Sequence, residues 1–297
     1  MIVQVLCIYA AYMLSNVIPA AYQYIYSRCR NHQVWDDIKG RHVLINGATG
    51  SIGAALALEF ANRGMKIVLV GKNESKLVKI HLKISQITEC HMYIIDYTKK
   101  NNFDFIDKYD IRVLVNCVGT ANTSPGYFVE HPFEEIIKTN LEGPVVLMKR
   151  ILANMMENGC GYVLSIGPLM ENVPSPLYSS YGCSKAGLVS LSNSLYYELE
   201  ECGINVEYAY FGYMGQSKDG QDSSSVFRPS PRVLACSILS TFGSGKACIP
   251  YLPHFLVYLV IICIPSPLLN RLIFFSNRQK MIDERKRMAS CYKDKDR

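Results

Sequence analysis

Two side chains with complementary acid–base chemistry, Tyr181 and Lys185, lie four residues apart in the stretch Y-G-C-S-K. On a helix this spacing places both side chains on one face. A tyrosine, with its usual pKa of about 10, is a poor acid catalyst near neutral pH, and a nearby ammonium group lowers that pKa. The pair therefore predicts that Tyr181, assisted by Lys185, donates a proton to a carbonyl oxygen while the carbonyl carbon accepts a hydride.

A glycine-rich turn, N-G-A-T-G-S-I-G at 46–53, follows an apolar run and precedes a stretch of helical character. Glycine lets the backbone approach a pyrophosphate at the N-terminus of the next helix. A tight turn without a ligand would have the same glycines, but the strand–turn–helix context favours a dinucleotide site. The residues predicted to contact the dinucleotide here are Gly47, Ser51, Ile52 and Gly53, with Tyr181 and Lys185 at its nicotinamide ribose.

The end of the second apolar run, V-L-V-G-K-N, bears on the choice of dinucleotide. A carboxylate there would bind the adenosine ribose, but the first acid is Glu74. Lys72 instead offers a positive charge to a 2′-phosphate, which predicts NADPH rather than NADH; a solvated lysine is the alternative. Asp96 either accepts from the adenine amino group or starts a turn.

Short apolar runs alternate with helical stretches from Arg41 onward. Most of these runs are apolar throughout, which is typical of a parallel sheet covered on both faces. We therefore expect an α/β fold with a Rossmann-like, doubly wound parallel sheet. The predicted strands are 42–46, 66–70, 91–96, 112–116, 161–166 and 205–210.

Both flanks of this region suggest contact with a membrane. Residues 2–26 carry no charge and are long enough to cross a hydrocarbon core of roughly 30 Å, and Arg28 and Arg30 follow at once. A retained N-terminal transmembrane helix is favoured over a cleaved signal peptide or a buried soluble helix. The apolar run 251–268 is short for a span, so it is a membrane-associated segment or the wall of a substrate tunnel, with a second span still open.

The expected organisation has five parts. They are a transmembrane anchor over 1–27, a basic juxtamembrane linker over 28–40, a Rossmann-like domain over 41–250, an apolar membrane-associated segment over 251–275 and a charged, frayed cytosolic tail over 276–297. A Ser-rich loop over 216–231 and a helix over 232–242 fall within the domain.

Composition excludes two other classes of function. The net charge of +6 lies largely near the ends of the chain, which indicates a membrane surface and not a nucleic-acid partner. The 11 cysteines form no C-x-x-C pair and the 6 histidines do not lie beside them at ligand spacing, so no metal site is expected. Scattered cysteines suit a reducing compartment.

Together these motifs resemble the short-chain dehydrogenase/reductase family over about residues 41–250. The resemblance rests on the glycine turn, N-C-V-G at 116–119, Asn140 in I-I-K-T-N, and Y-G-C-S-K. The chain is most similar to the membrane-bound very-long-chain 3-oxoacyl-CoA reductases, which are related to 17-beta-hydroxysteroid dehydrogenases. That similarity rests on the N-terminal anchor, on V-P-S-P-L-Y-S-S-Y-G-C-S-K, on P-S-P-R-V at 229–233 and on the basic C-terminus.

The resemblance implies a function in lipid metabolism. It implies NADPH-dependent reduction of the 3-keto group of long-chain 3-oxoacyl-CoA in microsomal fatty-acid biosynthesis, with Tyr181, Lys185 and Asn140 as catalytic residues. Asn140 would hold a water relay to Lys185, and Asn116 and Gly119 would shape the cofactor wall near the adenosine.

The same resemblance implies a location and partners. The ending K-D-K-D-R, with Lys293 and Lys295, looks like a dilysine retrieval signal of the endoplasmic reticulum. The protein would then lie in that membrane with its catalytic domain in the cytosol, in contact with membrane lipid and other elongation enzymes. A homodimer through helices near 142–157 and 179–201 is expected.

One departure from the family pattern bears directly on catalysis. The family's catalytic serine lies thirteen residues before the tyrosine, and Pro168 occupies that position. Proline has neither a hydroxyl nor an N–H. Losing one such donor costs roughly 2.7–4 kcal/mol of transition-state stabilisation. Ser165, Ser175 and Ser179 are candidate substitutes.

Three smaller departures concern the cofactor. Ser51 replaces a glycine of the turn, Cys117 replaces an asparagine, and Met214 lies near an expected threonine that binds the carboxamide. With Pro168, the first and last favour a non-catalytic nucleotide-binding or scaffold protein. Intact Tyr181, Lys185 and Asn140 favour an enzyme, with a steroid or retinoid carbonyl reductase as the alternative within that class.

Overall fold

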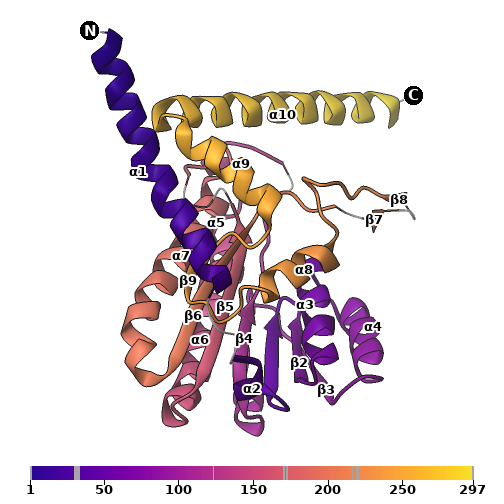
Figure 1. Cartoon of the computed structure of the whole chain (residues 1–297). Coiled ribbons are helices and arrows are strands. Elements are labelled where there is room, and N and C mark those ends of the chain that lie inside the picture. Colours follow the sequence, from indigo (N-terminus) through magenta and orange to yellow (C-terminus); the bar gives the residue numbers. More distant parts are fainter. Residues whose placement is uncertain are drawn as a thin grey trace.

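The computed structural model describes residues 2–29, 34–122, 124–169, 171, 173–215, 217–218 and 221–295. Within these residues, seven strands form one parallel sheet of order β3-β2-β1-β4-β5-β6-β9 (Figure 1). The strands are β1 His42–Asn46, β2 Lys66–Gly71, β3 Cys90–Ile94, β4 Ile111–Asn116, β5 Gly161–Pro168, β6 Ile204–Phe211 and β9 Lys246–Cys248. The predicted Rossmann-like parallel sheet is confirmed.

Helices cover both faces of this sheet. The helices are α1 Ile2–Cys29, α2 Val34–Ile38, α3 Ser51–Asn62, α4 Glu74–Ile84, α5 Phe133–Ile137, α6 Gly143–Glu157, α7 Ser179–Leu199, α8 Pro231–Leu239, α9 Leu252–Cys263 and α10 Ser266–Lys295. Short turns of helix are η1 Asp104–Lys108, η2 Phe128–Glu130, the π-helix η3 Lys138–Glu142 and η4 Glu200–Cys202.

Each face of the sheet has its own apolar cluster. On one face, Leu56 and Phe60 of α3 pack with Leu234 and Ile238 of α8. On the other face, side chains of α6 and α7, such as Ile151, pack against β4, β5 and β6. Because both faces are covered, the strands need apolar residues at every position, which is why the sequence shows unbroken apolar runs.

The seventh strand, β9, has no counterpart in the sequence-based prediction. It is three residues long, and its first residue, Lys246, is exposed. It forms by pairing with β6, where Glu207 lies opposite Lys246. A strand this short carries too little pattern to be predicted, because long-range pairing alone defines it.

The loop over 216–231 contains a short antiparallel pair, β7 Ser217–Lys218 and β8 Gln221–Asp222. Residues 216, 219 and 220 lie outside the described part. The next helix, α8, begins where Ser230 Oγ accepts a hydrogen bond from the Val233 N–H and Pro231 takes the first helical position. The predicted helix over 232–242 is thus confirmed in its main part.

Helix α1 packs against the rest of the protein over its C-terminal half. Gln23 and Arg28 donate hydrogen bonds to the carbonyls of Ala247 and Pro250. The ring of Tyr24 stacks on Phe255 of α9 with centroids 4.2 Å apart. Figure 1 shows α1, α9 and α10 gathered at one end of the sheet.

The predicted N-terminal helix is therefore present, but not as a simple span. In the described chain no single helix has both the length and the apolar character that crossing a bilayer needs. The helices Leu252–Cys263 and Ser266–Arg287, bent by 115° relative to each other, reach that length and apolar character only when they are counted together.

The tail differs from the frayed segment that its charge suggested. Helix α10 continues as far as Lys295, because Arg, Lys, Glu, Gln, Met and Ala are all good helix formers. Residues 296–297, which complete the K-D-K-D-R ending, lie outside the described residues.

Candidate active site

A cavity of about 210 Å³ lies where the carboxyl ends of β1, β4 and β5 meet; we call it the site cavity. The sheet order reverses between β1 and β4, and ligands of open α/β sheets bind at such a switch point. The lining residues are Ile52, Cys117, Val118, Gly119, Thr120, Ala121, Ile166, Gly167, Pro168, Tyr181, Lys185 and Phe211.

The glycine turn fits closely against the wall of this cavity. Gly47 has φ +93°, and a Cβ there would lie 2.6 Å from the Val118 nitrogen. A Cβ at Gly53 would lie 2.3 Å from the Gly47 carbonyl oxygen. Both positions therefore require glycine.

The first turn of α3 has the donors that a dinucleotide phosphate needs. Gly50 precedes the helix and provides no side-chain cap, so the first N–H groups of α3 remain available to an anion. Ser51 is exposed on this turn and Ile52 lines the site cavity. The residues present therefore fit a bound dinucleotide.

Asn116 and Gly119, both predicted at the cofactor wall, have different places. Gly119 lines the site cavity, and a Cβ on it would lie 3.4 Å from Lys185 Cε. Asn116 is buried below, where its Oδ1 accepts from Asn46 Nδ2 at 3.1 Å. Asn116 therefore joins β4 to β1 and supports the wall from beneath.

Two departures from the family pattern, Cys117 and Met214, lie in apolar surroundings. Cys117 donates to the Asn46 carbonyl oxygen at 3.0 Å, and burial raises its pKa to about 12, so it stays a neutral thiol. Met214 packs against the apolar cluster on the α3 and α8 face of the sheet.

The structure brings the two predicted adenosine-side residues together. Lys72 Nζ lies 3.1 Å from Asp96 Oδ2, and 69% of the Lys72 side chain is exposed. Burial raises the pKa of Asp96, but hydrogen bonds from Thr98 and Lys72 outweigh it and hold that pKa below its ordinary value. A charged pair of this kind at the end of β2 presents a cation at the surface.

Tyr181 and Lys185 both line the site cavity from the first turns of α7, as their spacing predicted. Lys185 is 3% exposed and its Nζ donates to the Val118 carbonyl oxygen at 3.2 Å. Burial lowers the pKa of Lys185, and the nearby Glu171 and Cys117 partly offset this.

The predicted lowering of the Tyr181 pKa is wrong in this structure. Burial raises that pKa well above its usual value, and the negative charge of Glu171 raises it further. The ammonium of Lys185 is instead engaged with a backbone carbonyl.

Asn140 ties the cavity wall to α7. It lies fully buried in the π-helix η3, where its Oδ1 accepts from the Thr120 N–H at 2.7 Å and its Nδ2 donates to the Thr120 carbonyl at 2.8 Å. Its Nδ2 also donates to Ser184 Oγ at 3.0 Å. Thr120 and Ser184 are its hydrogen-bond partners among the described residues. Asn140 thus fixes the loop beside Lys185.

Pro168 lies at the site cavity, and the three candidate serines do not. Ser165 is fully buried between β5 and α7, where its Oγ accepts from Ser192. Ser175 and Ser179 line a separate cavity of about 640 Å³, which we call the loop cavity. None of the three therefore lies at the site cavity.

Sequence reasoning missed Glu171. Its carboxyl group is buried, interacts electrostatically with Lys185 and Tyr181, and accepts a hydrogen bond from Tyr208 Oη. Burial raises its pKa to about 7. One signal was present, because Glu171 is the only acid between Ser165 and Tyr181 in the sequence.

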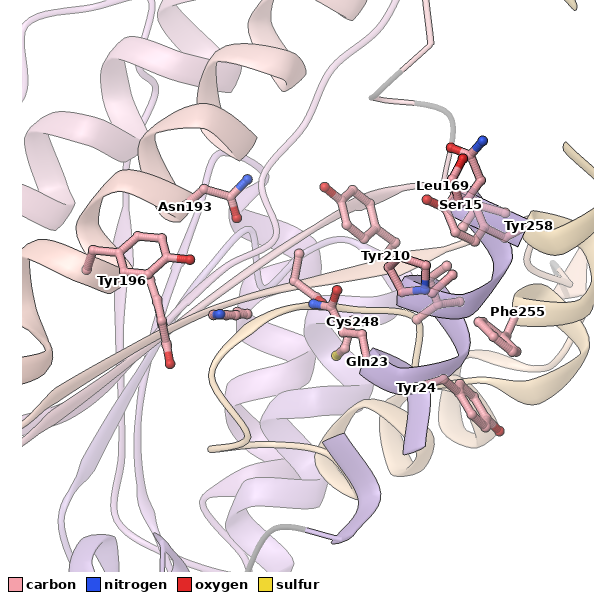
Figure 2. Close-up of a pocket in the computed structure, with 17 residues that line it drawn as sticks. Ser15, Gln23, Tyr24, Leu169, Asn193, Tyr196, Tyr210, Cys248, Phe255 and Tyr258 are labelled. Carbon is pink, nitrogen blue, oxygen red and sulfur yellow. The ribbon is translucent and has the colours of Figure 1, made fainter. Parts of the chain in front are cut away.

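A third cavity, of about 650 Å³, lies between α1 and the sheet; we call it the helix cavity (Figure 2). Leu169 and Tyr210 line it, whereas their neighbours Pro168 and Phe211 line the site cavity. The ends of β5 and β6 therefore separate the two cavities. Phe255 and Tyr258, from the apolar run 251–268, form part of the wall.

Residues 41–224 match the model of the short chain dehydrogenase family. The matched region is more than half of the chain and includes both the glycine turn and the Tyr181–Lys185 pair. The protein therefore belongs to the short-chain dehydrogenase family.

Relatives narrow the comparison. The very-long-chain 3-oxoacyl-CoA reductase of Aspergillus clavatus is 30% identical over 260 residues, which cover 81% of this chain and 74% of the relative. That of Anas platyrhynchos is 27% identical over 252 residues, 81% of each chain. A short-chain dehydrogenase from Sphingobium yanoikuyae in complex with NADPH is 25% identical, with a TM-score of 0.62 over 71% of this chain and 88% of that one.

Replacing Asn140 with alanine tests its supporting role. The change removes three hydrogen bonds of a fully buried side chain and leaves the buried Ser184 Oγ without this donor. Such a loss costs about 1–3 kcal/mol. We expect Asn140→Ala to lower the free energy of unfolding by that amount in denaturant titrations. Asn158→Ala removes an exposed hydrogen bond at the end of α6 and serves as the control, with an expected change within about 0.5 kcal/mol. Equal losses would contradict the assignment.

Proposed function

We propose that this protein uses NADPH to reduce the 3-keto group of long-chain 3-oxoacyl-CoA during microsomal fatty-acid elongation. The observation that carries the proposal is that Tyr181 and Lys185 line one cavity at the switch point, directly beside the glycine turn. The names of the relatives support the substrate class.

The proposed chemistry assigns a role to each side chain. When bound, the reduced nicotinamide supplies the hydride. Tyr181 donates the proton to the substrate oxygen, and Lys185, released from the Val118 carbonyl, stabilises the phenolate that Tyr181 becomes. Gly47, Ser51 and Gly53 hold the pyrophosphate against the first turn of α3.

Lys72 is proposed to select NADPH. Its exposed ammonium is free to turn from Asp96 toward a 2′-phosphate, whereas Asp96 stays bound to Thr98. Gly119 is proposed to form the cofactor wall beside Lys185, with Asn116 supporting that wall from beneath.

The proposed selectivity has a direct test. Lys72→Ala removes one charge-assisted hydrogen bond to phosphate, worth about 1.5–3 kcal/mol, so we expect the Kd of NADPH to rise about 10-fold or more. The Kd of NADH should change less than about twofold, since NADH has no 2′-phosphate. Fluorescence titration measures both, and Lys76→Ala on exposed α4 is the matched control. A similar loss for both cofactors would refute the selectivity proposal.

We propose that the acyl tail occupies the helix cavity. Rings and aliphatic groups, including Tyr24, Leu169 and Phe255, form part of its wall, beside polar side chains at Ser15, Asn16, Gln23, Asn193 and Lys246. The site cavity lies just across the end of β5.

Exposed apolar side chains support placement at a membrane. They gather on the three helices at one end of the sheet (Figure 1), and they include Ile8, Leu14 and Ile18 of α1, Leu256 and Val260 of α9, and Leu268, Leu272 and Phe275 of α10. We propose the endoplasmic reticulum membrane, with the catalytic domain in the cytosol, in line with the dilysine ending. Contact with other elongation enzymes and pairing through α6 and α7 belong to the same proposal.

Narrowing the helix cavity should change the preference for chain length. Ala20 lines the cavity, so Ala20→Phe should lower kcat/KM for long-chain substrates about 10-fold, since a few carbon atoms in an apolar pocket are worth about 1–3 kcal/mol. Short-chain substrates should change less than about twofold. Ile18→Phe is the control, because Ile18 of α1 is 61% exposed. An equal loss at every chain length would contradict the assignment of the tail.

A second candidate, a non-catalytic nucleotide-binding or scaffold protein, is favoured by one observation. Pro168 takes the position of the family's serine at the site cavity, and Ser165, Ser175 and Ser179 lie elsewhere. Turnover decides between the two candidates.

NADPH oxidation by membranes that contain the protein is the deciding measurement. With a long-chain 3-oxoacyl-CoA we expect turnover that falls at least 10²-fold in Tyr181→Phe, the usual contribution of a positioned acid, with an unchanged Kd for NADPH. A wild-type protein that binds NADPH but reduces no 3-oxoacyl-CoA would favour the scaffold. Turnover of a steroid or retinoid ketone alone would move the substrate to that class.

A further inference from the structure

Glu171 is an unusual residue to find beside this catalytic pair. Only 5% of it is exposed, and one carboxyl oxygen accepts from Tyr208 Oη. The other oxygen, Oε1, is buried without a hydrogen-bond partner among the described residues. A buried polar group that lacks a partner costs free energy, so it points to a partner supplied by a ligand.

The carboxyl group lies directly against the end of β5. A Cβ added to Gly167 would lie 2.1 Å from Glu171 Oε1 and 2.1 Å from Tyr208 Oη. The carboxyl group thus occupies the space beside Gly167, the residue that precedes Pro168. Glu171 lines the loop cavity, as Ser175 and Ser179 do, but its Oε1 also packs against Gly167, which lines the site cavity.

The groups that face Glu171 come from two elements. Tyr208 lies on β6, and Tyr181 and Lys185 lie on α7. Burial raises the pKa of Glu171 to about 7 and outweighs the charge of Lys185 and the hydrogen bond from Tyr208, which both lower it. A substantial fraction of Glu171 is therefore neutral at physiological pH. A neutral carboxyl group has an O–H to donate, and an apolar site can keep it neutral for that purpose.

We infer that Glu171, in its neutral form, donates to the substrate carbonyl the hydrogen bond that Pro168 cannot donate. This inference rests on the proposed reductase function. In the reduction, the hydride brings its electron pair to the carbonyl carbon and the C=O π pair moves to the oxygen. The Tyr181 proton then forms the new O–H bond. Glu171 keeps its own proton and stabilises the developing negative charge.

Three variants separate a donor role from a structural role. Glu171→Ala removes the donor and should lower kcat about 10²–10³-fold, the usual loss for one such donor. Glu171→Gln keeps the shape and an N–H donor and should stay within about 10-fold of wild type. Pro168→Ser in the Glu171→Ala background restores a hydroxyl at the family position and should recover at least about 10-fold.

The pH profile gives an independent signature. The neutral form is the active one, so kcat of the wild type should fall as the pH rises through about 7. Glu171→Gln should lack this fall. Lys185 and Tyr181 remain in that variant, so an alkaline limb that appears in it at a different pH belongs to them.

Protonation of Glu171 has a readout that needs no turnover. A protonated carboxyl band in the infrared spectrum of the protein should disappear as the pH rises through about 7. Glu207 is also buried with a pKa raised to about 8, so the band is read as the difference between wild type and Glu171→Gln. NADPH binding shows that the variants are folded.

The outcomes distinguish this inference from the proposed function. An active wild type whose Glu171→Ala variant loses less than about threefold, or whose Glu171→Gln variant keeps the same pH limb, overturns this inference alone. The inference alone is also overturned if the infrared difference between wild type and Glu171→Gln shows no carboxyl band that titrates. A wild type that reduces no 3-oxoacyl-CoA overturns the proposed function and this inference together.

Discussion

The site depends on one steric constraint, the close approach of the β1–α3 turn to the end of β4. Gly47 and Gly53 leave no room for a side chain, since a Cβ at either would overlap backbone atoms. This approach brings the first N–H groups of α3 beside the loop 117–121. It also sets the position of the Val118 carbonyl to which Lys185 donates. The glycine turn and Lys185 are therefore held in place by the same contact.

Buried polar side chains then hold a loop that has few backbone partners of its own. Asn46 and Asn116 join β1 to β4, and Asn140 satisfies both backbone groups of Thr120. Because the three asparagine side chains are buried, each bond costs more to lose than it contributes when made. A loop at a switch point can thus be rigid enough to position Lys185 without belonging to a strand.

Local pattern was enough to predict most of the fold and the placement of Tyr181 and Lys185 on one face, because apolar runs and an i, i+4 spacing are properties of neighbouring residues. It failed where partners are distant in sequence. Strand β9 exists only through its pairing with β6, and Glu171 meets Tyr208 across 37 residues. The predicted lowering of the Tyr181 pKa was wrong for the same reason, because burial, and not the nearby lysine, has the largest effect on that pKa.

The buried carboxyl group of Glu171 is explained by the missing donor at Pro168. Burying a carboxyl group with one oxygen unpaired costs about 1–3 kcal/mol, and Gly167 must leave space for it. A protein that had lost the family's serine and no longer catalysed the reaction would gain nothing from burying this carboxyl group. A site that still has to stabilise a developing oxyanion does gain, because a neutral acid can replace the missing hydroxyl. The buried carboxyl group and the missing donor lie at the same end of β5, so the unpaired oxygen of Glu171 is better explained by a ligand than by the fold.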